Sequence, residues 1–240
     1  MSIKSPIIDS IVKVVFDSSV PSQALVGILY QKFKSDLKTI ENLPILQVPA
    51  EIRQQNPELL KQPNYLLMGS AFTVSLGEGV VYIGCVIDRQ EKYYQGWDIF
   101  GAFANKVLKF MVESEYITSV NAVSVQYINF FDEPGLQDKT NLLVKVADEK
   151  VEDKKMNVFF NKNDDEKKLK IKLVGDAKVN SKNFKSTQGA VIDITSSQEV
   201  GLTVEKLKST IDELHLFAEN AFFDVVQTDA IPSDVVRRES

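Results

Sequence analysis

Apolar and polar residues alternate in two different ways within the first forty residues. From Ile8 to Phe16 the apolar residues fall mainly on even-numbered positions, which is typical of a strand with one buried face. After Pro21 the apolar residues recur every three or four positions from Leu25 to Ile40, which predicts a helix with a buried stripe. The chain therefore begins with a predicted strand and a predicted helix.

The same two patterns continue through the first half of the chain. Alternating residues at 66–76 and an apolar run at 80–87 flank the turn Gly77-Glu78-Gly79, which predicts a β-hairpin. A helical period covers 96–112, and alternation returns at 120–130. The predicted buried stripe of that second helix is Ile99, Phe103, Val107, Phe110 and Met111. The resulting order is βαββαβ, which is the ferredoxin-like order.

The second half of the chain is richer in predicted strands. Alternation predicts strands near 156–160, 169–173 and 190–194. A last apolar stripe from Leu207 to Val225 predicts a long closing helix, with Thr203 as its N-cap. Because helical stripes of this kind need a sheet face to cover, we expect an α+β fold with a mostly antiparallel sheet.

The turn Asp132-Glu133-Pro134-Gly135 divides the chain. We expect a βαββαβ half at residues 1–134 and a strand-rich half with its helix at 135–228. Residues 229–240 are expected to form a flexible tail. The two halves are expected to pack together, because the connection between them is short.

The composition excludes several classes of site. One cysteine among 240 residues excludes an internal disulfide and a cysteine-based zinc site, and one histidine excludes multi-histidine metal sites. The formal net charge of −5 argues against a protein that coats nucleic acid or an anionic membrane, because phosphate binding draws on clustered Lys and Arg. We expect no catalytic residue, metal or cofactor.

The amino-acid sequence shows no recognisable targeting signal. The first residues lack a signal-peptide core, and no window holds the roughly 18 consecutive apolar residues that a transmembrane helix needs. The lone Cys85 lies in an apolar strand, which fits a reducing compartment. We therefore expect a cytoplasmic protein without a membrane partner.

Five residues are candidates for a binding site, and each has a structural alternative. His215 lies along the apolar stripe of the last helix, so it either faces a ligand as an acid or base or is a half-buried hydrogen-bonded histidine. Three aromatic residues, Tyr93, Tyr94 and Trp97, crowd the start of the second helix. They form a binding lip, or Trp97 closes the end of the core. Asn129 shares a strand face with Tyr127 and either points into a pocket or caps the strand's end.

The chain also resembles a sporadically distributed family of uncharacterised prokaryotic proteins of similar length. The matching features are Pro6-Ile7-Ile8, Tyr94-Gln95-Gly96-Trp97 with Phe100, Gln126-Tyr127-Ile128-Asn129, and Leu214-His215 followed by Phe222 and Thr228. Family members usually have an arginine where Gln126 stands and a glutamate near Asp9. The resemblance implies no established activity, and the patchy occurrence of the family implies an association with mobile or defence islands.

Two classes of function follow from these observations. The first is a cytoplasmic binding or protein-interaction protein without catalytic activity, with an unknown protein or small-molecule partner, or a structural subunit of a complex. The alternative is a metal-dependent enzyme that acts on a nucleotide or another phosphorylated small molecule, with Asp9, Glu78 and His215 in its site. The sequence leaves the oligomeric state open.

Overall fold

The structure is a computed structural model of the 240-residue chain. It describes residues 5–87, 94–132, 134–136, 138–142, 145–146, 149–150, 156–181, 184–199 and 201–231. The expected tail therefore falls mostly outside the described residues. After the last helix, η3 (Thr228–Ala230) follows, and the backbone N–H of Gln227 donates to the carbonyl of Lys139.

One antiparallel sheet holds the main strands of both halves of the chain. Its strands are β1 (Ile7–Ser18), β2 (Thr39–Asn42), β3 (Tyr65–Met68), β4 (Phe72–Gly77), β5 (Val80–Cys85), β6 (Ile117–Asp132), β9 (Asn157–Asp164), β10 (Lys167–Ser181) and β11 (Phe184–Gln198). Their order across the sheet is β2-β3-β4-β5-β1-β6-β11-β10-β9. Because β6 pairs with β1 on one side and with β11 on the other, the two halves share a single sheet. A separate pair, β7 (Lys145–Val146) and β8 (Glu149–Lys150), lies apart from it.

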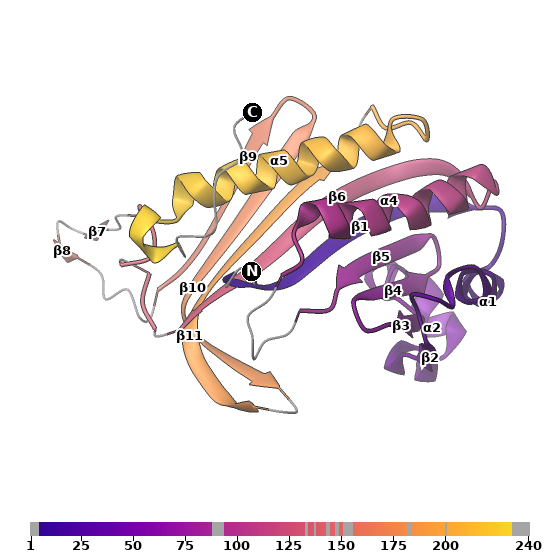
Figure 1. Ribbon diagram of the computed structural model, residues 1–240, viewed down its shortest axis with the longest axis horizontal. Helices are drawn as coiled ribbons and strands as arrows, with labels where there is room; N and C mark the ends of the chain where they lie inside the picture. The colour runs from indigo at the N-terminus through magenta and orange to yellow at the C-terminus, as the bar shows by residue number, and fades with distance from the viewer. Residues whose placement is uncertain are drawn as a thin grey trace.

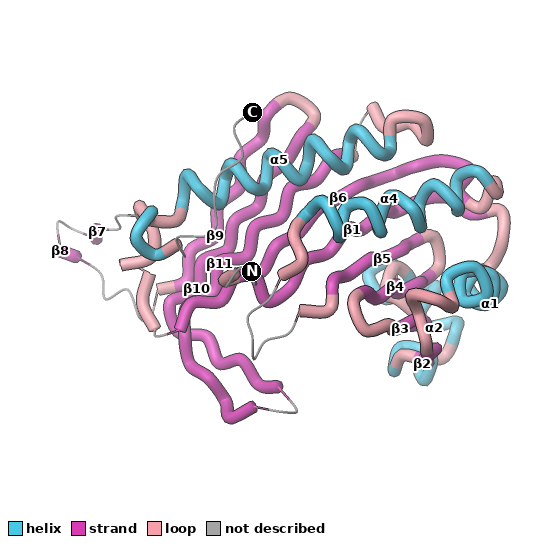
Figure 2. Tube along the Cα trace, in the orientation of Figure 1, coloured by secondary structure: helices cyan, strands magenta, loops and turns pink. Residues whose placement is uncertain are grey.

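The long helices pack on one face of the sheet (Figures 1 and 2). They are α1 (Ser22–Phe33), α4 (Trp97–Glu113) and α5 (Leu207–Val225). α5 packs mainly against β6 and β11, and α1 packs beside α4, where Phe33 meets Phe103 and Phe110 edge to face. The segment 41–64, which contains four prolines, forms η1 (Pro44–Gln47), α2 (Ala50–Gln55) and α3 (Pro57–Leu60). The structure is thus α+β with an antiparallel sheet, as the sequence predicts.

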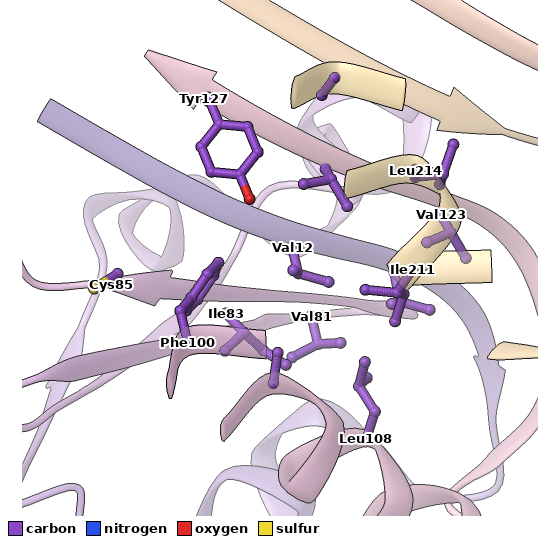
Figure 3. Close-up of a cluster of buried hydrophobic side chains, with 14 of the residues drawn as sticks. Val12, Val81, Ile83, Cys85, Phe100, Leu108, Val123, Tyr127, Ile211 and Leu214 are labelled. Atoms are coloured by element: carbon purple, nitrogen blue, oxygen red, sulfur yellow. The ribbon is translucent and has the colours of Figure 1, made fainter. Parts of the chain in front are cut away.

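The alternation along the central strands explains where the core lies. Val12 and Val14 of β1 and Val123 and Val125 of β6 are buried on the helix face, whereas their sequence neighbours, such as Lys13, are partly exposed on the opposite face. Side chains of β1, β5, β6, α4 and α5 converge there (Figure 3). No helix in the described part of the chain is long and apolar enough to cross a membrane.

Three local predictions were wrong. The first helix ends at Phe33, and Ile40 lies instead in the short edge strand β2, where it is 42% exposed. The segment 66–76 is two strands, β3 and β4, joined at Gly69, whose backbone lies so close to the carbonyl of Asp36 that a side chain has no room there. Ile99 is 49% exposed, because the buried stripe of α4 runs through positions 100, 103, 104, 107, 108 and 111, on a different side of the helix.

The last long helix, α5, begins slightly later than predicted. Thr203 does not cap α5 directly; its Oγ1 accepts a hydrogen bond from the backbone N–H of Lys206 in the preceding turn, and the helix starts at Leu207. The predicted buried line is confirmed for its main members, which are Leu207, Ile211, Leu214 and Ala218.

Candidate functional site

A hydrogen bond between β6 and α5 forms the centre of the candidate site. The hydroxyl of Tyr127 lies 2.9 Å from Nδ1 of His215, across 88 residues of sequence. Tyr127 reaches this position because it lies on the buried face of β6, and His215 does so because it follows the buried stripe of α5. Both side chains are almost fully buried, at 7% and 5% residue exposure. The structure therefore joins two of the predicted site residues directly.

Aromatic rings surround this pair. The indole of Trp97, the first residue of α4, stacks on the His215 ring with centroids 4.2 Å apart and an angle of 14° between the planes. Phe100 contacts the indole edge to face, and Tyr94 contacts Tyr127 in the same way. Four of the five candidate residues therefore form one cluster, which we call the Trp97–His215 cluster: Tyr94, Trp97, Tyr127 and His215.

The surroundings of the cluster keep the phenol of Tyr127 protonated. Burial raises the pKa of Tyr127 well above its usual range, the neighbouring Tyr94 raises it further, and Ser10 acts in the opposite direction. On its other side, Nε2 of His215 lies 3.9 Å from a carboxylate oxygen of Glu219, one helical turn further along α5. Tyr127 is thus suited to act as a neutral hydrogen-bonding group.

A hollow opens beside the cluster, between the start of α4 and the first half of α5. Its volume is about 380 Å³. It is lined by Trp97, Asp98, Gly101, Ala102 and Asn105 of α4 and by Lys208, Asp212, His215 and Leu216 of α5. Trp97 and His215 therefore contribute to its wall.

Asn129, the fifth candidate, has a structural role in the sheet. It is 1% exposed, and its Nδ2 donates to the backbone carbonyl of Ile192 on β11, 3.2 Å away. It shares the helix-side face with Tyr127, two positions along β6, and it does not line the hollow. Its Nδ2 group thus finds an acceptor on the neighbouring strand, as buried polar groups usually do.

The acidic residues proposed for a metal-dependent enzyme lie far apart. Glu78 lies in the β4–β5 turn, where it accepts a hydrogen bond from the hydroxyl of Ser22, and that turn adjoins Phe16. Asp9 lies seven residues back along β1, roughly 23 Å away at strand geometry. Within the described residues no three His, Cys, Asp or Glu side chains are grouped so as to hold a metal ion. Asp9 and Glu78 therefore do not form one site.

Cys85 belongs to the core, as its apolar strand predicts. It is 7% exposed, and burial raises the pKa of its thiol to about 11. A thiol with this pKa is protonated at neutral pH and is a poor nucleophile.

Four polar residues of the hollow, Asp98, Asn105, Lys208 and Asp212, are not among the residues that the sequence indicates. All four are ordinary surface residue types on two separate helices. In the sequence, these residues are marked only by their positions beside the buried stripes of the two helices, with Lys208 and Asp212 one turn apart on α5. Such positions are shared by many surface residues.

Comparisons with known proteins add no relative. No protein family model matches the chain, and no curated protein sequence matches it. The resemblance suggested by the short motifs therefore stays a prediction.

Proposed function

We propose that this chain is a binding protein without catalytic activity and that its partner occupies the hollow beside the Trp97–His215 cluster. The observation that carries the proposal is the structure of the hollow. An aromatic wall of Trp97 and His215 lies next to polar side chains from both helices. Pockets that combine apolar and aromatic walls with a few polar groups are the usual sites for ligands.

The contacts inside the cluster favour binding over acid–base catalysis. Nδ1 of His215 is engaged by Tyr127, and its ring is covered on one side by the indole of Trp97. A general base needs a hydrogen-bonded hydroxyl or water that it can deprotonate, and the phenol of Tyr127 is held protonated by burial. We infer that His215 shapes and stiffens the wall of the hollow.

We also propose that the protein is cytoplasmic and that it is associated with mobile or defence islands. We further propose that residues 1–134 have the ferredoxin-like order. Support for this order comes from the spatial sequence β4-β5-β1-β6 and from α1 and α4, which pack on the same face.

The experiment compares the native protein with a variant whose hollow is filled. Ala102 is exposed and lines the hollow, so Ala102→Phe should occupy the space without disturbing the core. Both proteins would be purified under native conditions, and the molecules extracted from them would be compared by mass spectrometry. We expect a small molecule or peptide that is enriched in the native protein and absent from the variant.

Rebinding of the extracted material can be followed through Trp97, which is the only tryptophan of the chain. Its emission should change on binding, because the indole forms part of the wall. The proposal fails if both proteins carry the same material in equal amounts, or if nothing that is extracted alters the emission of Trp97.

A further inference from the structure

His215 is the only side chain of the sequence whose ordinary pKa lies between pH 5 and 8, and it lines the hollow. It is stacked on Trp97, the only tryptophan, with ring centroids 4.2 Å apart. The emission of one residue therefore reports the protonation of one other residue. A change at His215 would alter the proposed binding site, so its regulatory meaning rests on the proposed function.

The hydrogen bond between Tyr127 and His215 can run in either direction. When His215 is neutral, the phenol donates to Nδ1, 2.9 Å away, because burial keeps the phenol protonated. The hydroxyls of Tyr94 and Ser10 lie close enough to Tyr127 to shift its pKa. When Nδ1 carries a proton, the Tyr127 hydroxyl can turn towards one of these oxygens and accept the new N–H. The hydrogen bond is therefore available in both protonation states.

Two contacts of His215 stabilise the imidazolium form. Nε2 lies 3.9 Å from a carboxylate oxygen of Glu219, and a carboxylate at this distance favours a cation. The face of the Trp97 indole, at 14° to the imidazole plane, attracts a cation. On the sheet side, β11 faces this turn of α5 with the uncharged Ser196. Burial opposes the charge, but Nδ1, Nε2 and the ring face each have a suitable neighbour, so the folded protein can hold the proton.

The other charged groups near His215 lie around the hollow. Among the described residues, Asp98 of α4 and Asp212 of α5 bring two carboxylates to its wall, and Lys208 of α5 brings one ammonium. The amino end of α4, which begins at Trp97, adds a partial positive charge. The side chains of the hollow therefore carry one net negative charge when His215 is neutral, and none when it is protonated.

We propose that His215 is a proton switch in the wall of the hollow. At mildly acidic pH, Nδ1 takes a proton from bulk water, the Tyr127 hydroxyl changes from donor to acceptor, and Nε2–H remains beside Glu219. No other bond forms or breaks. The hollow then loses its net negative charge, so a positively charged group of a partner binds less tightly and a negatively charged group binds more tightly.

The first test records the emission of Trp97 between pH 8 and pH 5 at constant ionic strength. We expect one step, with weaker emission at pH 5, because a stacked imidazolium withdraws electron density from the excited indole. His215→Gln should remove the step, and circular dichroism would verify that this variant is folded. The nuclear magnetic resonance signals of the only histidine should titrate with the same midpoint, a measurement that needs only the native protein.

Two variants on α5 distinguish the carboxylate beside Nε2 from a general effect of charge. Glu219→Gln should move the midpoint to lower pH by about one pH unit, because the imidazolium loses its nearest carboxylate. Glu213→Gln removes the same charge from an exposed residue that pairs with Lys167 and does not line the hollow. The midpoint of this control should move less than that of Glu219→Gln.

The second test measures the charge of the hollow with iodide and caesium ions, which quench indole emission on contact. From pH 8 to pH 5.5, the quenching constant of iodide should rise and that of caesium should fall. Both constants should be independent of pH in His215→Gln. The ionic strength is held constant, because salt screens exposed charges.

Three results would overturn the inference. The first is the absence of a step in the native emission and histidine signals between pH 8 and 5. The second is an equal shift of the midpoint in Glu219→Gln and Glu213→Gln, and the third is quenching by iodide and caesium that does not change with pH. None of these measurements uses a bound partner. The proposed function would survive their failure, and the proton switch would survive the failure to extract any binding molecule.

Discussion

Replacing Gly101 with alanine should test how firmly Trp97 is held. A Cβ atom at this position of α4 would lie 2.7 Å from Cε2 of Trp97 and 3.0 Å from Cδ2 and Nε1. The indole cannot move aside freely, because one side stacks on His215 and Phe100 packs against it edge to face. The new methyl group therefore overpacks this part of the core.

The expected magnitude follows from two opposing effects. Exchanging glycine for alanine inside a helix normally stabilises it by about 1 kcal/mol. Overpacking a tight site costs about 1–3 kcal/mol. The net result at Gly101 should be a free energy of unfolding between unchanged and about 2 kcal/mol lower. Gly27 in α1 is a matched control, because nothing lies within 4 Å of its Cβ position, and Gly27→Ala should stabilise the protein.

Urea unfolding followed by circular dichroism gives the two stabilities, and emission from the only tryptophan reports the position of its ring. Gly101→Ala should be less stable than Gly27→Ala and should shift the emission spectrum, whereas Gly27→Ala should not. The reasoning is refuted if Gly101→Ala stabilises the protein as much as the control and leaves the emission unchanged.

Three further predictions concern buried polar groups. Tyr127→Phe removes the partner of Nδ1 of His215 and should lower the free energy of unfolding by about 1–3 kcal/mol in urea titrations; an unchanged midpoint would show that the hydrogen bond is not needed. Burial raises the pKa of the Cys85 thiol from 9.0 to about 11, so the thiol ionises first in the unfolded protein and the free energy of unfolding should fall as the pH rises from about 9 towards 11. The same pH titration of Cys85→Ser should lack this decrease. Iodoacetamide at pH 8.5 should label the native thiol far more slowly than the unfolded one. Ser22→Ala should lower the free energy of unfolding by about 1 kcal/mol, because the Ser22 hydroxyl donates to Glu78 and accepts from the buried Asn64. A decrease in calorimetry of less than a few tenths of a kcal/mol would contradict this prediction.

The sequence predicts local structure well where one periodicity is uninterrupted. The two-residue period that places Tyr127 on the buried face of its strand is confirmed, and so is the helical period that places His215 on a buried stripe. The alternation at 66–76 predicts one strand, because two short strands with matching alternation have the same pattern as one long strand. The close approach of the Gly69 backbone to the carbonyl of Asp36 is a tertiary contact, and the alternation of apolar and polar residues does not reveal it.

The candidate site was predictable in its parts but not in its geometry. Trp97 is indicated by its place at the start of a helix and His215 by its place on an apolar stripe, and each is also the only residue of its type. Their stacking depends on how α4 and α5 are placed along the sheet, which is set by packing between distant segments. Asn129 lies on the same strand face as Tyr127, but its side chain donates to the backbone of β11 and does not line the hollow.

The position of β6 has a consequence for any attempt to divide the chain. This 16-residue strand is paired along both sides, by β1 and by β11. Ending the polypeptide after Asp132 would leave one side of β6 as a long unpaired edge and would uncover the apolar residues that α5 shields. Unprotected edges of this kind recruit other strands. A shortened chain should therefore aggregate.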